Sequence, residues 1–459
     1  MKTTKFFLMA ALALTFAACS NDDNDILNPA QTAKGEGITI TATLAPKDAG
    51  ATTRAVSEGT GEIVAEWAEN EGIAILYTVG STKYKSNATI TSVDANGVAT
   101  ITFTVESGTP DNTECTLVYP KGAANDTGVK DYATLLASQG GTLNADLDVR
   151  VGAGKIQTTT PGLDVTTQPA AQYSIFKFTT QNISGTGITP SEFKVSNSEG
   201  NVITTVSPSS SAFYVALPAL SASTYWFSAT ADSKPYIAKA TTAAATVAGK
   251  YYQTTVKMAT IGDVILDDGK FAAPSSTGTK VAMIAYVGND AETSPTNTTY
   301  NHGLALALED VSVVKTWCSQ TDATCLGTGH QFDSKAGAKG DMAGIDNTDY
   351  LKNHAPAGHT HAAATAARQF KYVSTVDAGT HPTGTSAWFL PSAGQWDKMA
   401  HAAGSYENLK TNAGLQEFAF YWSSTECDAG AAWAFCPFDG SWNNIYKGND
   451  ARFRACLAF

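Results

Sequence analysis

Two cysteines in the second half of the chain have the type and spacing for covalent chemistry. Cys318 and Cys325 are separated by six residues, and in an oxidising compartment such a pair can close a small loop. We therefore predict a disulfide between them. Spacing selects no partner for four further cysteines, so their pairing stays open: Cys115, Cys427, Cys436 and Cys456.

Three neighbouring histidines, His354, His359 and His361, are candidate metal ligands. A closed zinc site requires four positioned ligands, and the sequence has neither a CxxC nor an HExxH motif. We therefore interpret these histidines as part of a solvated loop and predict no metal site.

An acidic segment just before the histidines offers oxygen ligands for calcium. It contains Asp341, Asp346 and Asp349, but their spacing differs from the order of ligands in an EF-hand loop. Calcium is thus conceivable but not supported by a motif, and we predict no cofactor.

The remaining patterns do not favour catalysis. The sequence has no Ser-His-Asp order, no paired-carboxylate signature and no glycine-rich phosphate loop. A reactive cysteine needs a cationic environment, and only Arg452 and Arg454 lie near the C-terminal cysteines in sequence. We predict that the protein is not an enzyme and assign no catalytic residue.

The overall composition favours an exported β protein. The chain has 459 residues, of which 43% are hydrophobic and 16% charged, with a net charge of −12; globular proteins usually have about 25% charged residues. This length predicts roughly three domains. A wholly disordered chain is excluded, and nucleic acid is a poor partner for so acidic a protein.

The N-terminus has the pattern of a lipoprotein signal peptide. Lys2 and Lys5 precede an apolar run, and Ala17-Ala18 stand directly before Cys19. Small residues before a cysteine fit the lipoprotein cleavage site, so we expect lipidation at Cys19 and anchoring in the outer membrane. The acidic run at 20–25 is similar to an export tag of surface lipoproteins.

Strands dominate up to about residue 260, and the chain then becomes mixed. In 38–44, apolar residues alternate with threonines, as in a half-buried strand. Helices are expected at 363–372 and at 392–400, the latter capped by Ser392. With a linker expected at 158–162, we predict a signal peptide, a pro-segment, two β-sandwiches and an α+β domain: 1–18, 19–54, 55–160, 161–260 and 261–459.

Four features stand in order in the first 260 residues: the lipoprotein signal, the first strand at 37–45, the segment 51–56 and the segment 251–258. Together they resemble the fimbrillin family of type V pilins. This resemblance implies two transthyretin-like β-sandwiches, cleavage by an Arg-specific protease between Arg54 and Ala55, and loss of the first strand. The groove left behind would accept a donor strand from another pilin subunit.

Five ordered segments stand out in the last part of the chain: 302–310, 388–396, 421–426, 432–433 and 454–459. In this order they resemble the C-type-lectin-like domain of bacterial surface adhesins. This resemblance implies that the strands after the Trp-Ser-Ser segment present a ligand face. The Glu-Pro-Asn triplet of calcium-dependent lectins is absent, so calcium-dependent sugar binding is not expected.

We assign the ligand face to residues between Glu426 and Arg454. Trp422 and Trp433 are expected in the core, whereas Trp442 is expected at the surface. The predicted ligand-binding residues are Asp428, Ala429, Gly430, Ala434, Cys436, Asp439, Trp442, Asn443, Asn444, Tyr446, Asn449 and Asp450.

Many residues on this face are products of randomising the adenines of an Asn AAC codon. The pattern resembles receptors diversified by retroelements, and simple drift in a loop is the alternative. Under diversification, Cys427 and Cys436 are variable-face residues rather than a disulfide.

Together these patterns predict a fimbrial tip adhesin that binds an unknown protein or glycan. The precursor is expected at the outer membrane, and the mature subunit in the fimbrium. Residues 457–459 are expected to form a strand of the folded last domain, so the subunit would accept but not donate a strand. The alternative is an anchored polysaccharide-binding lipoprotein that does not belong to a pilus.

Overall fold

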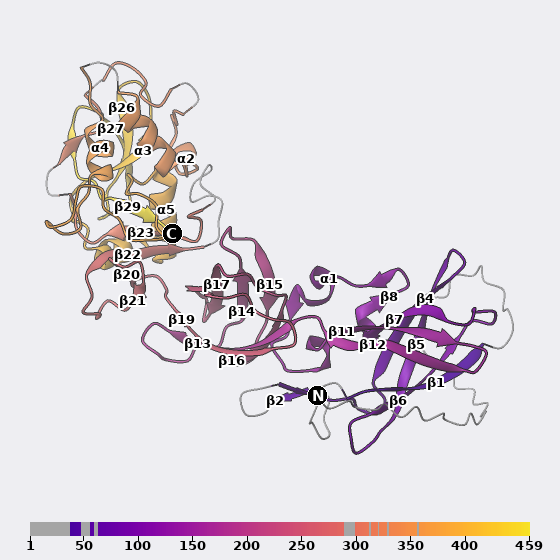
Figure 1. The fold of residues 1–459 in the computed structure, drawn as a ribbon. Coiled ribbons are helices and arrows are strands. Elements are labelled where there is room, and N and C mark those ends of the chain that lie inside the picture. The colour runs from indigo at the N-terminus through magenta and orange to yellow at the C-terminus, as the bar shows by residue number, and fades with distance from the viewer. Residues whose placement is uncertain are drawn as a thin grey trace.

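The structure is a computed structural model, and it describes residues 37–46, 56–58, 63–288, 299–311, 314–319, 321–327, 330–355 and 358–459. Cys19, Arg54 and Ala55 lie outside these residues. Three units follow one another along the molecule (Figure 1). None of the described helices is long and apolar enough to cross a bilayer.

The first unit is built on a curled antiparallel sheet of seven strands. The strand order is β1-β6-β5-β4-β7-β11-β12, and the sheet rolls so that edge strands β1 and β12 contact each other. Its concave face encloses one core that includes Ile73, Ile101 and Leu117. The strands are β1 (Ile38–Leu44), β4 (Gly72–Val79), β5 (Thr82–Val93), β6 (Ala99–Val105), β7 (Thr113–Tyr119), β11 (Arg150–Gln157) and β12 (Gly162–Ala171).

The segment predicted as a linker is instead a hairpin turn. Strands β11 and β12 pair antiparallel from Arg150↔Ala171 to Gln157↔Gly162, so 158–162 reverse the chain within the first sheet. Asp111 fixes this turn by accepting the N–H groups of Thr158 and Thr159 at 2.7 and 3.0 Å. The first unit therefore extends to Ala171, beyond the expected end at residue 160.

Short elements surround the first sheet. They are β2 (Val56–Glu58), β3 (Ile63–Ala65), β8 (Ala124–Asn125), β9 (Gly128–Val129), α1 (Tyr132–Leu136), β10 (Ser138–Gln139) and two 3-10 turns at Lys121–Ala123 and Ala145–Leu147. Strand β10 pairs in parallel with β15 of the second unit, so the two units share backbone hydrogen bonds.

The second unit is a sandwich of a five-stranded and a three-stranded sheet, β10-β15-β14-β17-β18 and β16-β13-β19. A cluster of phenylalanines fills the space between them, including Phe178, Phe193 and Phe213. The strands are β13 (Ser174–Asn182), β14 (Glu192–Ser196), β15 (Val202–Val206), β16 (Ala212–Leu217), β17 (Thr224–Ala231), β18 (Lys234–Thr241) and β19 (Tyr251–Met258).

The third unit contains both helices and strands. The expected boundary at 260/261 falls between β19 and β20, the first strand of this unit. Its main sheet has the order β21-β20-β22-β23-β29, and a second sheet has the order β25-β26-β27. The strands are β20 (Val264–Leu266), β21 (Phe271–Ala272), β22 (Lys280–Val287), β23 (Gly303–Ala307), β24 (Lys315–Thr316), β25 (Tyr421–Glu426), β26 (Ala431–Phe435), β27 (Trp442–Tyr446), β28 (Asp450–Ala451) and β29 (Cys456–Ala458).

Both expected helices are present in the third unit, and three more accompany them. Ser392 caps α5 by accepting the N–H of Gln395, and the Gln395 side chain accepts the N–H of Ser392 in return, a capping box. The helices are α2 (Lys335–Ala338), α3 (Gly344–Asn353), α4 (Ala362–Arg368), α5 (Ala393–Ala402) and α6 (Tyr406–Ala413).

Candidate functional site

Strand β1 is the element on which an exchange of strands would act. It pairs with β6 over seven residues, from Ile38↔Val105 to Leu44↔Ala99. The side chains of Ile40 and Leu44 are fully buried in the core of the first unit, while the threonines between them face outward. Burying an Ile or Leu side chain contributes about 1.5–3 kcal/mol, so removing β1 would expose an apolar groove.

The predicted ligand-binding residues are mostly exposed, but two of them are buried. Ala434 has no exposed surface and Trp442 is 4% exposed. The Trp442 ring packs against Phe435, and its Nε1 donates to Tyr406 Oη at 3.1 Å. The assignment of both to the ligand face is therefore wrong, because β26 is buried on both of its faces: Ala434 packs in one core cluster of the third unit, and Trp442 packs with Phe435 in the other. Trp422 and Trp433 are buried, as expected.

The exposed residues gather along β27 and the turns at its ends. Asn444 Nδ2 donates to Cys427 Sγ at 3.7 Å, and the Lys447 N–H donates to the carbonyl of Gly430 at 2.9 Å. These two bonds place the turn that contains Asp428 beside the end of β27. Ala429, Gly430 and Cys436 are partly exposed, and the exposed members of the predicted set are Asp428, Asp439, Asn443, Asn444, Tyr446, Asn449 and Asp450.

Two of these carboxylates also hold turns. Asp428 accepts the N–H groups of Gly430 and Ala431 at 2.7 and 2.8 Å, and Asp439 accepts the N–H of Ser441 at 2.9 Å. The bond from Ser441 lowers the pKa of Asp439. A ligand can therefore use the second oxygen of each group, while Asn443 and Tyr446 have side chains open to solvent.

A buried ion pair, which no sequence pattern predicted, lies beneath the exposed residues of this face. Glu426 and Lys447 are both fully buried, with Oε1 and Nζ 2.5 Å apart. Glu426 also accepts the N–H groups of Cys325 and Leu326 at 2.6 and 2.9 Å, and Lys447 donates to the carbonyl of Ala429 at 2.8 Å. The pair thus ties the loop at 323–326 to both edges of the predicted face.

A group of exposed phenylalanines lies next to α6 and was also missed. Phe418 is 78% exposed, and its ring centroid lies 4.7 Å from that of Phe438, while Lys410 Nζ lies 5.9 Å above the Phe438 ring. Exposed, contiguous aromatic side chains are typical of binding surfaces. The Phe-Ala-Phe pattern at 418–420 is the sequence signal for this group.

Two of the three aspartates considered for calcium are engaged by protein side chains, and among the described residues the three do not form a group that could hold a metal ion. Asp341 is buried, where its carboxylate accepts Thr425 Oγ1 at 2.6 Å and Asn347 Nδ2 at 2.9 Å, and burial raises its pKa. Asp349 instead forms an ion pair with Arg368 at 2.7 Å. These contacts are structural and do not assemble an oxygen-lined cation site.

One of the three histidines, His361, differs from the expected solvated loop, whereas His359 is partly exposed. His354 is exposed and stacks on Tyr350, whereas His361 is 1% exposed and lies beside Cys318 and Cys325. The two sulfurs are 3.2 Å apart and are present as thiols, so the predicted disulfide remains a prediction.

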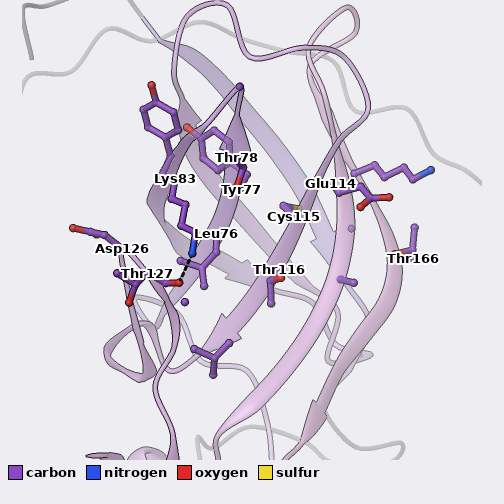
Figure 2. A pocket seen from close by; sticks show the side chains of 17 residues that line it. Leu76, Tyr77, Thr78, Lys83, Glu114, Cys115, Thr116, Asp126, Thr127 and Thr166 are labelled. Carbon is purple, nitrogen blue, oxygen red and sulfur yellow. Dashed lines mark hydrogen bonds between the residues drawn. The ribbon is translucent and has the colours of Figure 1, made fainter.

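A hollow of about 820 Å³ lies on the outer face of the first sheet, beneath the β8–β9 hairpin. Figure 2 shows Lys83 reaching across it to the carbonyl of Thr127, at 3.2 Å. Polar residues such as Thr78, Glu114 and Thr116 line it. No sequence pattern pointed to this hollow, because its walls come from five separate strands and a hairpin.

Comparisons with known proteins give only distant structural likenesses. No protein-family model matches the chain, and no curated protein matches it. A fimbrial protein from Bacteroides ovatus is 14% identical, covers 92% of this chain and 99% of its own, and has a TM-score of 0.32.

Two putative cell adhesion proteins are also similar. The one from Bacteroides uniformis is 13% identical over 49% of this chain and 96% of its own, with a TM-score of 0.29. The one from Bacteroides ovatus is 14% identical over 49% and 95%, with a TM-score of 0.25. Since each TM-score lies below 0.5, we base the functional proposal on features of this chain.

Proposed function

We propose that this protein is a pilus-related adhesin of the cell surface, assembled by strand exchange in its first unit. The observation that carries the proposal is β1, an edge strand that fills the core with alternate side chains and precedes Arg54 in the sequence. Cleavage after Arg54 would release residues 19–54, free the product from its lipid at Cys19, and open the groove to a strand of another subunit.

The third unit would end the fibre in this scheme. Strand β29 has no exposed residue and pairs with β23 from Leu304↔Ala458 to Leu306↔Cys456. A strand buried in this way is not available for donation, so we place the subunit at the tip, where it accepts a strand.

N-terminal sequencing of the mature protein tests the proposal. We expect Ala55 as the first residue after treatment with an Arg-specific protease, and Arg54→Lys, which keeps the charge but removes the cleavage residue, should stay uncut. The cut protein should cap pili without forming homopolymers. A mature form that keeps lipidated Cys19 would instead indicate the alternative, an anchored polysaccharide-binding lipoprotein.

For the third unit we propose ligand binding through the exposed residues on and around β27, with a protein or glycan as the ligand. A glycan and cell-surface array probed with the full chain would identify it. We expect Asn443→Ala and Tyr446→Ala to weaken capture, and Asn87→Ala, an exposed change in the first unit, to leave capture unchanged. Loss of capture with Phe418→Ala alone would move the site to the exposed phenylalanines.

Diversification of this face is a further part of the proposal. A near-copy of the codons for residues 427–453 beside a reverse-transcriptase gene would support it, and the absence of such a copy would reject it. Ala434 and Ala451 are buried, so variation at these two positions would alter packing rather than contacts with a ligand.

A further inference from the structure

Two cysteines and a histidine from separate segments meet in the interior of the third unit. Cys318 follows β24, Cys325 lies in the next loop, and His361 directly precedes α4. Their exposed fractions are 0%, 7% and 1%. The sulfur atoms are 3.2 Å apart, and these atoms and an imidazole nitrogen all lie within 4.8 Å of one another.

The imidazole is oriented as it is in metal sites. Nδ1 of His361 forms a hydrogen bond to the backbone carbonyl of Leu351. A carbonyl oxygen can only accept, so Nδ1 carries a proton, and in the neutral imidazole Nε2 then has the free lone pair. Nε2 is buried and has no hydrogen-bond partner. Metal-bound histidines commonly donate their second N–H to a carbonyl in this way.

The charges around the cluster fit a bound cation. Lys447 Nζ lies 3.8 Å from Cys325 Sγ, but the same Nζ is paired with Glu426 at 2.5 Å, so this pair is neutral as a unit. Two thiolates would add two buried negative charges, which a cation bound between them would offset. The loop that contains Cys325 is held in place beside Cys318 and His361, because Glu426 accepts the N–H of Cys325 at 2.6 Å.

We propose that Cys318, Cys325 and His361 form a binding site for a thiophilic d¹⁰ cation, of the Zn²⁺ or Cu⁺ class. Thiolate and imidazole are the ligands that these ions prefer. Two sulfurs bound at about 2.3 Å in a tetrahedral site lie about 3.8 Å apart, so small rotations of the cysteine side chains suffice. A disulfide would use the two sulfurs but leave Nε2 of His361 without a partner, whereas a metal ion engages all three groups.

Zn²⁺ and Cu⁺ differ in the number of ligands that they need. Among the described residues, no fourth His, Cys, Asp or Glu belongs to the cluster. Cu⁺ accepts three soft ligands, whereas Zn²⁺ would need a further donor such as water. The site does not depend on the proposed adhesin function, since it concerns only the interior of the third unit.

The test is a metal titration of the reduced full-length protein under anaerobic conditions. Zn²⁺ and Cu⁺ are supplied in separate arms, each against a chromophoric chelator of known affinity. We expect one equivalent of at least one ion per chain, and at least 100-fold weaker binding in Cys325→Ser and His361→Ala. Two control variants, His359→Ala, two residues from His361 in sequence, and Cys436→Ser, lie outside the cluster and should bind like the unmodified protein.

A second measurement does not depend on variants that fold poorly. Co²⁺ added to the unmodified reduced protein should give a thiolate-to-metal charge-transfer band in the near ultraviolet. Two results would overturn the proposal. One is the absence of any bound ion, and the other is a stoichiometric Cys318–Cys325 disulfide that forms in preference to metal binding when an oxidant and a metal ion are supplied together.

Discussion

At the scale of single residues, the buried ion pair between Glu426 and Lys447 holds together the segments around the predicted ligand face. Both side chains are fully buried, and their hydrogen bonds join β25, the end of β27 and the loop at 323–326. Removing one partner leaves an uncompensated charge in a low-dielectric interior, which is far more costly than breaking a surface pair.

We predict that Glu426→Gln destabilises the third unit by about 3–5 kcal/mol. Glu407→Gln provides the matched control, because the Glu407 side chain is 60% exposed where it pairs with Lys410 at 2.9 Å, and solvent-exposed carboxylates in such pairs contribute at most about 1 kcal/mol. Urea unfolding followed by tryptophan fluorescence reports on the third unit, which contains six of the eight tryptophans. Equal effects of the two substitutions would contradict this role for the buried pair.

At the scale of elements, the alternation of β1 gives its two faces different roles. Ile40 points into the core with no exposed surface, whereas Thr41 faces solvent on the same strand. A strand held in this way is stable as long as its inward face stays apolar, and its outward face tolerates polar change.

We predict that Ile40→Asp releases β1, because an unpaired carboxylate would be buried in the core of the first unit. Thr41→Asp introduces the same side chain on the outer face and should leave β1 in place. Hydrogen exchange of the β6 amides that pair with β1 checks this expectation: they should lose protection in the first variant only. Retained protection in Ile40→Asp would show that β1 is not held by its inward side chains.

At the scale of the whole molecule, the junction between the second and third units contains a buried histidine. His302 is 1% exposed and stacks on Trp226 of β17 with ring centroids 4.0 Å apart. Trp226 also approaches Phe271 and Phe459, and Lys239 Nζ lies 5.6 Å from its ring. Burial, with a smaller contribution from Lys239, lowers the pKa of His302 to about 4.

We predict that the junction weakens in acid. The unfolded state binds a proton at His302 near pH 6.5, whereas the folded state does so only near pH 4, so this stabilisation is complete above pH 6.5 and is lost as the pH falls to about 4. Melting temperatures between pH 4 and 7 should fall more steeply in the unmodified protein than in His302→Phe, which keeps the stacking. Parallel curves for the two proteins would contradict the assignment to His302.

Several features could be predicted from the sequence because they depend on local patterns. The period-2 alternation of 38–44 specifies β1, Ser392 and Gln395 specify the start of α5, and the change of composition near residue 260 marks the third unit. The first two signals lie within a few residues of the element that they specify, and the third is a property of composition along the chain, so none of them depends on contacts between distant segments.

Other features were decided by tertiary structure alone. A Thr-Pro-Gly segment has the same composition in a linker as in a hairpin, and only the pairing of β11 with β12 shows that 158–162 form a turn. The burial of Trp442 depends on which face of β27 meets the core. Cys318, Cys325 and His361 come together because β24 and α4 pack against each other, a contact between segments that no local pattern encodes.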